Sequence, residues 1–507
     1  MGLLNSIITW MIKKRIHQMD LFRKYPLEVQ QELFKNLIQT ASQTEFGKRY
    51  KFRAIENYQQ YREIVPLHTY ESFFPFIEKV MHGQQNVIWP SEIKWFSKSS
   101  GTTNSRSKFI PVSQESMEDC HFKAGKDLLS IYVNNHEDTK IFDGKGLTVG
   151  GSHQINEFDP SATSYYGDVS AVLMQNLPHW AQFIRTPSLE TALMNNWEEK
   201  IERMIKETRN ENVTHLAGVP TWIILLLERL IKEEGAKSIL EIWPNLEVFF
   251  HGAVSFTPYR NLFKTLIPNE NMRYYDTYNA SEGFFAIQDQ NQVDELLLML
   301  DYGIFYEFIP CDELDRENPK ALCLAEVSLG VNYAMVISTN SGLWRYIIGD
   351  TVKFTSLYPF RIKITGRTKH FINVFGEEVI IENAEQAIAM TCEQYGTIVN
   401  NFTVAPIFFQ QQQKGGHEWI IELKERPKKE ENFRKTLDQN LRAINSDYDA
   451  KRQGNLALME PVIHFVDEGT FYSWLKKKGK LGGQNKVPRL SNTREYVEEI
   501  LSMVREK

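Results

Sequence analysis

Residues 97–111 combine the residue types that can hold a phosphate group. The segment reads Ser-Lys-Ser-Ser-Gly-Thr-Thr-Asn-Ser-Arg-Ser-Lys-Phe-Ile-Pro, so hydroxyl side chains flank Gly101 and Lys108 follows them. Backbone N–H groups and hydroxyl donors around a glycine can converge on an anion, and the lysine adds a full charge. The spacing is not that of a Walker motif. The segment therefore predicts either a loop that binds a nucleotide triphosphate or a surface turn rich in serine and threonine.

A second group of candidate binding residues follows a predicted strand over 272–275 and reads Tyr-Asn-Ala-Ser-Glu-Gly. Tyr278 can stack on a flat base, Ser281 can donate to a phosphate, and Glu282 can bind the Mg²⁺ that accompanies ATP. The alternative is a turn at the end of the strand, closed by Gly283.

Two further groups lie later in the chain. Asp350 follows Gly349 at an expected strand end, where a carboxylate can accept both hydroxyl protons of a ribose; the alternative is a simple β-turn. Arg367 follows Thr-Gly, and Lys486 lies in a late glycine-containing loop from which it could reach a phosphate. Because several lysines precede that loop, a solvated basic tail is the alternative.

Composition limits the class of protein. A chain of 507 residues is too long for one ordinary core, so two or more domains are expected. A net charge of −6 argues against a general nucleic-acid binder. The four scattered cysteines show no metal-ligand spacing, and no apolar run approaches the roughly 18 residues of a membrane span. We therefore expect a cytoplasmic protein with neither nucleic-acid nor membrane partners.

Hydrophobic patterning divides the chain into three stretches. Residues up to about 50 show helical spacing, and from there to about 360 short apolar strands alternate with helices, which favours a large α/β layered domain. Beyond about 367 the elements become smaller and predict an α+β domain of roughly 140 residues. The principal expected strands lie at 147–150, 248–251, 333–339, 401–409, 419–423 and 462–466. The principal expected helices lie at 115–132, 196–210, 221–234, 258–265 and 431–446.

Four motifs occur in an order that resembles one known family. They are SSGTT with SKFIP at 99–111, YNASEG at 278–283, WRYIIGDTV at 344–352 and NKVPR at 485–489. On these motifs the chain resembles a bacterial-type member of the auxin-responsive Gretchen Hagen family of acyl acid amido synthetases. That family belongs to the adenylate-forming superfamily of firefly luciferase and acyl-CoA ligases. The resemblance covers essentially the whole chain and implies an adenylation domain over 1–366 and a small mobile α+β cap domain over 367–507.

The resemblance also implies roles for individual residues. Tyr278 would lie beside adenine, Glu282 would bind Mg²⁺, and Asp350 would hold the ribose. Lys486 of the cap domain would reach the α-phosphate. The remaining ATP-binding residues would be Ser99, Ser100, Gly101, Thr102, Thr103, Ser281 and Arg367, with Lys108 near the phosphates.

Two departures from the family pattern put details in doubt. Many members carry a glycine where Ser105 stands, which could alter the flexibility of the loop. Plant members usually carry an arginine where Ile347 stands, so any contact of that arginine is missing here.

The implied function is a two-step ligase. A carboxylic acid would attack ATP to give an acyl adenylate and pyrophosphate, and an amine, expected to be an amino acid, would then take the acyl group and release AMP. Positioned charges would offset the charge that develops on the phosphate. A hinge between about 352 and 370 would let the cap domain move. Val219 and Trp222, at the start of a very apolar helix, are candidates for acyl binding, although core packing explains that helix equally well.

Two alternatives remain open from the sequence. An acyl-CoA or other thioester-forming ligase would share the first step and deliver the acyl group to a thiol. A non-catalytic protein could bind a nucleotide or an acyl group as a regulator.

Overall fold

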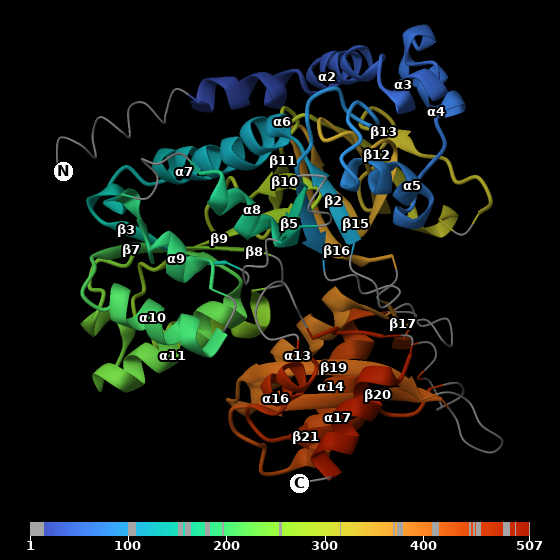
Figure 1. The fold of residues 1–507 in the computed structure, drawn as a ribbon. Coiled ribbons are helices and arrows are strands. Elements are labelled where there is room, and N and C mark those ends of the chain that lie inside the picture. Colours follow the sequence, from blue (N-terminus) through green and yellow to red (C-terminus); the bar gives the residue numbers. More distant parts are fainter. Residues whose placement is uncertain are drawn as a thin grey trace. The chain divides into compact units, whose positions relative to one another are not determined.

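The computed structural model describes most of the chain. The described residues are 15–99, 108–150, 156–157, 164–177, 183–194, 197–252, 256–314, 316–368, 371–372, 379–407, 415–445, 448–449, 452, 458–479, 487–491 and 493–505. They form two compact units (Figure 1). Unit 1 comprises residues 1–253 and 269–364, and unit 2 comprises residues 254–268 and 365–507. Residues 254–268 join two strands of unit 1 but pack within unit 2.

Unit 1 is built on a mixed twelve-stranded sheet. Its strand order is β13-β12-β14-β15-β16-β11-β10-β9-β8-β7-β3-β6. The strands are β3 Lys145–Val149, β6 Arg185–Thr186, β7 Val213–Gly218, β8 Val248–Gly252, β9 Arg273–Ala280, β10 Gly283–Ile287, β11 Leu296–Leu298, β12 Ile304–Pro310, β13 Leu322–Cys323, β14 Asn332–Thr339, β15 Tyr346–Leu357 and β16 Phe360–Arg367. Strands β6, β3, β7, β8 and β9 run parallel, and antiparallel pairing begins at β9–β10.

A second, smaller sheet in unit 1 carries the expected phosphate segment. Its order is β2-β1-β5-β4, and its strands are β1 Trp95–Ser99, β2 Lys108–Val112, β4 Asn156–Glu157 and β5 Tyr165–Gly167. Helix α5, Tyr70–Met81, packs against β2. Its N-terminus is fixed by a capping box, in which Thr69 accepts from the backbone N–H of Ser72 and the Ser72 hydroxyl accepts from that of Thr69.

The helices of unit 1 flank these sheets. A helix also spans 15–24. The others are α2 Pro26–Ala41, α3 Glu45–Arg49, α4 Tyr58–Ile64, α5 Tyr70–Met81, α6 Gln114–Ser116, α7 Lys123–Asn135, α8 Val169–Gln175, α9 Leu189–Ala192, α10 Trp197–Thr208 and α11 Pro220–Glu234. A π-helical turn, Met117–Phe122, joins α6 to α7. Helix α11 has Pro220 at its first position and is followed by Gly235, whose φ is +65°. Proline at the start and glycine just after the end are common at helix termini.

Helix α7 identifies which strand residues face which side of the parallel strands. The Tyr132 ring of α7 contacts the rings of Phe250 in β8 and Tyr275 in β9 at 5.5 and 5.3 Å between centroids. Because side chains alternate along a strand, His251 and Asp276 point to the opposite face. Helix α11 packs against α10 and β7, and Figure 1 shows these two helices lying together.

Unit 2 has a three-stranded sheet of order β19-β20-β21 with helices on both faces. The strands of this sheet are β19 Val399–Ile407, β20 Gly416–Leu423 and β21 Val462–Val466. A separate two-stranded sheet consists of β17 Phe371–Ile372 and β18 Val379–Ile380. The helices of unit 2 are α12 Arg260–Leu266, α13 Ile381–Tyr395, α14 Glu430–Ile444, α16 Thr470–Lys477 and α17 Glu495–Arg505. One core lies between the sheet and α13 and α14, and the other between the sheet and α16 and α17. The expected α/β class and the smaller α+β elements near the C-terminus are confirmed.

The boundary between the two units, after Ile364, lies within the range 352–370 in which a hinge is expected. Two details differ from the sequence-based expectations. Tyr278 lies within β9 and Asp350 within β15, instead of beyond the ends of strands. In each case a polar or glycine-containing stretch continues a strand whose partners lie far away in the sequence.

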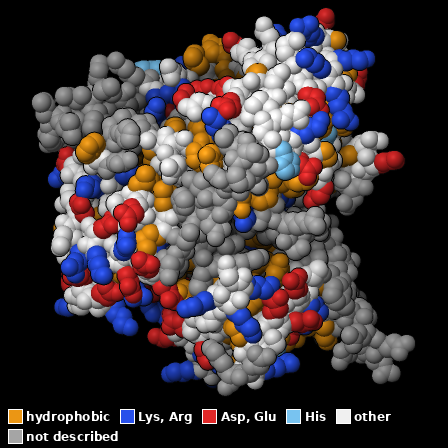
Figure 2. Space-filling model, viewed as in Figure 1, with side chains coloured by type: hydrophobic (Ala, Val, Ile, Leu, Met, Phe, Trp, Pro, Cys, Tyr) orange, Lys and Arg blue, Asp and Glu red, His pale blue; other side chains and the backbone are white. Residues whose placement is uncertain are grey.

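Among the described helices, none is long and apolar enough to span a membrane. Figure 2 shows Lys and Arg side chains interspersed with Asp and Glu side chains over the described part of the face in view.

Candidate functional site

The carboxyl ends of the parallel strands meet at one edge of the large sheet. Val149 of β3 pairs with Gly218 of β7, Gly218 pairs with His251 of β8, and His251 pairs with Asp276 of β9. Tyr278 lies two residues beyond this row. In open α/β sheets ligands bind outside the carboxyl ends of the strands, so this edge is the candidate site.

Tyr278 and Asp350 are brought together at the candidate site. The Tyr278 hydroxyl donates to Oδ2 of Asp350 at 2.7 Å, and both residues are buried. This bond connects two motifs separated by 72 residues. Of the residues expected to touch ATP, these two are joined directly.

A bulge in β15 aims Asp350. Ala334 of β14 pairs with Thr351, whereas Val336 pairs with Ile347, so three residues of β15 lie opposite one of β14. Gly349 inside this bulge has φ +88°, a conformation that glycine adopts without strain. Bulges re-aim a side chain without ending the strand, which is why the Gly-Asp pair is neither a strand end nor a simple turn.

Ser281 and Glu282 form the turn between β9 and β10. Ser281 is buried, and its hydroxyl has no hydrogen-bond partner among the described residues. Gly283 begins β10, and a Cβ there would lie 2.7 Å from Cδ1 of Ile304, so a larger residue would require the Ile304 side chain to shift. A buried hydroxyl without a partner is unusual in a native protein and fits a donor reserved for a ligand.

Cys120, which the sequence analysis did not propose as a site residue, contacts the backbone just after this turn. Its sulfur accepts from the backbone N–H of Phe284 at 3.2 Å. The residue belongs to the π-helical turn Met117–Phe122, and such turns are frequent at functional sites. Burial raises the pKa of the thiol to about 12, so Cys120 acts here as a packing group and acceptor.

The expected phosphate segment forms a hairpin. Ser99 at the end of β1 pairs with Lys108 at the start of β2, and the Lys108 ammonium lies 5.6 Å from the centre of the Tyr70 ring. The Tyr70 hydroxyl also accepts from the backbone N–H of Phe109 at 2.8 Å. The hairpin therefore brings Ser99 and Lys108 opposite one another. Ser100, Gly101, Thr102 and Thr103 lie outside the described residues.

The other residues expected at the site lie in different parts of the chain's structure or outside its described part. Arg367 ends β16 and belongs to unit 2, and Lys486 lies outside the described residues. Val219 directly follows the carboxyl end of β7, and Trp222 lies in the first turn of α11, where it is buried. Both acyl-binding candidates thus lie at the same sheet edge as Tyr278.

His251 and Asp276 are the polar pair that the sequence missed. Nδ1 of His251 lies 3.4 Å from Oδ1 of Asp276. The same carboxylate oxygen accepts from the backbone N–H of Thr277 at 2.8 Å, and the Thr277 hydroxyl donates to the carbonyl of His251 at 2.9 Å. In the sequence His251 is one of twelve scattered histidines, and no local spacing connects it to Asp276.

A buried lysine fixes the neighbouring strand end. Lys200 of α10 is completely buried, and its ammonium donates to the carbonyl of Gly150, just beyond β3, at 3.2 Å. Burial lowers the pKa of Lys200 to about 8, and the charge of Asp168 opposes that shift.

This pKa predicts a change of stability with pH. Between pH 8 and about 10.4 the folded chain has released the Lys200 proton whereas the unfolded chain keeps it, so stability rises with pH in this window. We expect the free energy of unfolding of the wild type to gain about 2 kcal/mol relative to K200M between pH 7.5 and 9.5. Urea unfolding of both proteins at the two pH values measures it, and parallel pH profiles would contradict it.

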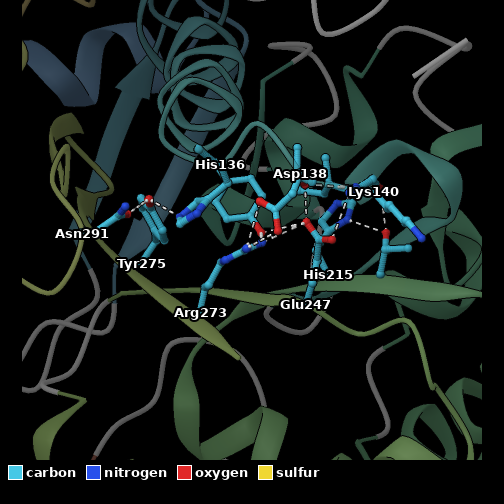
Figure 3. Close-up of polar contacts among 12 residues, drawn as sticks. His136, Asp138, Lys140, His215, Glu247, Arg273, Tyr275 and Asn291 are labelled. Carbon is cyan, nitrogen blue, oxygen red and sulfur yellow. Dashed lines mark hydrogen bonds and ion pairs between the residues drawn. The ribbon is translucent and has the colours of Figure 1, made fainter. Parts of the chain in front are cut away.

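A polar cluster lies at the other end of these strands (Figure 3). Glu247 directly precedes β8 and accepts from the Tyr132 hydroxyl at 2.7 Å and from the backbone N–H of Lys140 at 3.0 Å. Arg273 at the start of β9 donates to Tyr132 and to Asp138. These groups satisfy one another at the amino ends of the strands, so we assign the cluster a structural role.

The described residues contain no group of three or more His, Cys, Asp or Glu side chains that could hold a metal ion. Mg²⁺ commonly uses one or two carboxylates together with substrate phosphates and water. Glu282, in the turn next to Ser281, is a donor of that kind.

Comparisons with known proteins extend over nearly the whole chain. Residues 15–272 match the GH3 family N-terminal domain, residues 297–367 the GH3 family central domain and residues 382–495 the GH3 family C-terminal domain. The indole-3-acetic acid-amido synthetase GH3.3 of Arabidopsis thaliana is 22% identical, covering 91% of this chain and 89% of that protein. The jasmonoyl–L-amino acid synthetase JAR4 of Nicotiana attenuata is also 22% identical, covering 68% and 69%.

Solved structures show the same fold. The GH3.15 acyl acid amido synthetase in complex with 2,4-DB superposes with a TM-score of 0.80 at 15% identity, covering 97% of this chain and 96% of that one. A 2-hydroxyisobutyryl-CoA ligase in the postadenylation state superposes with a TM-score of 0.61 at 12% identity, covering 94% and 91%. The fold is thus shared with these two ligases. With family models matching all three regions in order, the chain belongs to the GH3 family.

Proposed function

We propose that this chain is an ATP-dependent ligase that adenylates a carboxylic acid and then transfers the acyl group to an amino acid. The observation that carries the proposal is the 2.7 Å hydrogen bond between Tyr278 and Asp350, at the carboxyl edge of the sheet. Membership of the GH3 family supports it, because the named relatives are acid-amido synthetases.

In the first step Asp350 accepts the ribose hydroxyl protons, and Tyr278 both orients that carboxylate and borders adenine. Ser281 donates to phosphate, as do Ser99, Ser100, Gly101, Thr102 and Thr103 of the β1–β2 hairpin. Lys108, opposite Ser99, adds positive charge. The substrate carboxylate attacks the α-phosphorus, and pyrophosphate leaves. These groups act by position and charge, without a covalent enzyme intermediate.

Glu282 would hold Mg²⁺ together with the ATP phosphates, and the ion would neutralise charge on the phosphate oxygens. The acyl group lies against Val219 and Trp222.

In the second step the amine attacks the acyl carbonyl, an amide forms and AMP leaves. We assign the adenylation domain to 1–366 and the mobile cap domain to 367–507. Lys486 of the cap domain reaches the α-phosphate. Arg367 of the same domain lies close to the hinge. We place the protein in the cytoplasm, with small-molecule acids and amines as its partners.

A substrate screen tests the proposed function. Carboxylic acids are first screened for pyrophosphate release from ATP, and the active acids are then incubated with each amino acid or with CoA. We expect pyrophosphate release that depends on the acid, and AMP and amide formation that depend on the amino acid, with the product identified by mass spectrometry. Product formation with CoA alone would indicate a thioester ligase. ATP binding without pyrophosphate release from any acid would indicate a non-catalytic binding protein.

A further inference from the structure

His251 occupies a position at the candidate site that none of the roles above requires. It is the next-to-last residue of the fully buried strand β8 and pairs in register with Asp276 of β9. Tyr278 lies two residues farther along β9 and, by strand alternation, on the same face as Asp276. Strand geometry therefore places the Cα of His251 about 8 Å from that of Tyr278.

Different side chains occupy the opposite face of strands β8 and β9. A Cβ at Gly252 would meet the Thr277 hydroxyl at 2.7 Å and Oδ1 of Asn279 at 3.3 Å, so those side chains share the face of Gly252. His251, Asp276 and Tyr278 consequently share the other face. Since Tyr278 binds Asp350, His251 lies on the face and at the edge where the nucleotide is expected.

His251 and Asp276 form a histidine–carboxylate contact. Nδ1 of the 4% exposed His251 lies 3.4 Å from Oδ1 of Asp276, whose side chain is 35% exposed. The backbone N–H of Thr277 fixes the carboxylate, and the Thr277 hydroxyl fixes the His251 carbonyl. A carboxylate at this distance from Nδ1 favours the tautomer that carries the proton on Nδ1, which leaves Nε2 as the proton acceptor.

The groups that face His251 come from its own strand and from the two strands beside it. On β7 its register partner is Gly218, which has no side chain, and on its own strand the Phe249 ring lies 5.4 Å away. On β9 the titratable groups of the same face are Tyr274, Asp276 and Tyr278. Asp276 is thus the charged group paired with the ring among these described strands.

We propose that His251 is the general base of amide formation, a role that rests on the proposed function. The amine nitrogen attacks the acyl carbonyl carbon, and the new C–N bond leaves that nitrogen positively charged. Nε2 of His251 takes one proton from this nitrogen while the carbonyl–phosphate C–O bond breaks. AMP leaves with the electron pair of that bond, and the imidazolium returns its proton to water. Asp276 acts through His251 as a positioning residue.

Separate assays of the two steps test this role. H251N and D276N are compared with the wild type for acid-dependent pyrophosphate release and for amide formation, with amino acid and with hydroxylamine as acceptors. General-base catalysis contributes about 10²–10⁴-fold, so we expect H251N to slow amide formation at least about 100-fold. D276N should slow it less than H251N does, because the imidazole that takes the proton remains in place. Pyrophosphate release should change less than about threefold in both, because a base for the amine plays no part in the first step.

Hydroxylamine and a control variant complete the design. Hydroxylamine is largely unprotonated at neutral pH and a strong nucleophile, so hydroxamate formation should be retained in H251N. The control is H136N, which removes a histidine from the amino end of the strands and should leave both steps intact.

Several outcomes would overturn the proposal. Equal losses with amino acid and hydroxylamine would assign His251 to acyl binding, and a loss of pyrophosphate release in H251N would assign it to the first step. A melting temperature lowered in proportion to activity would assign it to folding. A wild type that releases no pyrophosphate with any acid would instead contradict the proposed function, and the base with it.

Discussion

Replacement of Asp350 by asparagine is expected to give the largest loss of adenylation among single changes at the nucleotide site. A carboxylate has two acceptor oxygens, so it can accept from the Tyr278 hydroxyl and from the ribose hydroxyls together. Asparagine replaces one of these oxygens by an NH₂ group, which is a donor, so one of the two contacts is lost. A lost hydrogen bond to a charged group is worth about 1.5–3 kcal/mol, so kcat/KM for ATP should fall about 10- to 150-fold. Acid-dependent pyrophosphate release at varied ATP concentration measures the change.

A modified nucleotide shows whether Asp350 acts on the ribose. The wild type should use 2′-deoxy-ATP less well than ATP, and D350N should discriminate less between the two. Y278F keeps the carboxylate and removes its donor, so a smaller loss of about 2- to 10-fold is expected. Undiminished preference for ATP in D350N would show that Asp350 does not bind the 2′-hydroxyl.

Replacement of Arg345 by methionine is expected to give the largest loss of stability. Nη2 of Arg345 lies 2.9 Å from Oε1 of Glu307, and the side chains are 5% and 0% exposed. Nη1 also donates to the carbonyls of Arg62 and Val65. Removal of one partner of a buried ion pair leaves the other charge uncompensated, at a cost of about 3–5 kcal/mol. The free energy of unfolding from urea titration measures it.

A double variant and an exposed ion pair distinguish the effect of the buried charge from the effect of the lost Arg345 contacts. R345M/E307L removes both charges, so it should be more stable than R345M alone. R229M breaks the exposed pair of Arg229 with Glu233 and should change stability by less than about 1 kcal/mol. A double variant as unstable as R345M would show that the lost carbonyl contacts, instead of the buried charge, cause the effect.

Local sequence patterns predicted much of the fold and part of the site. The strand over 462–466 was predicted at its observed bounds, and the helix expected over 221–234 begins one residue earlier, at Pro220. Such elements are identified by hydrophobic periodicity and by proline and glycine at their ends, which act between near neighbours. Asp350, Tyr278 and Ser281 were identified because each lies within a short motif of chemically suited residues.

The same local patterns misplaced two of these residues in their strands. Asp350 was expected at a strand end because Gly-Asp resembles a turn, but the pairing of β15 with β14 continues through a bulge. Tyr278 was expected after a strand, but β9 extends to Ala280 because β10 pairs with it. Strand ends depend on partners that a local pattern does not contain.

The sequence by itself determined the family, the fold class and the motif residues, because these follow from residue types at short spacing. The tertiary structure alone decided which of them meet. It joined Tyr278 to Asp350, gave Arg345 a buried partner in Glu307, and set His251 beside Asp276. All three contacts cross between strands, and the register and bulges of the whole sheet set them, which no segment encodes alone.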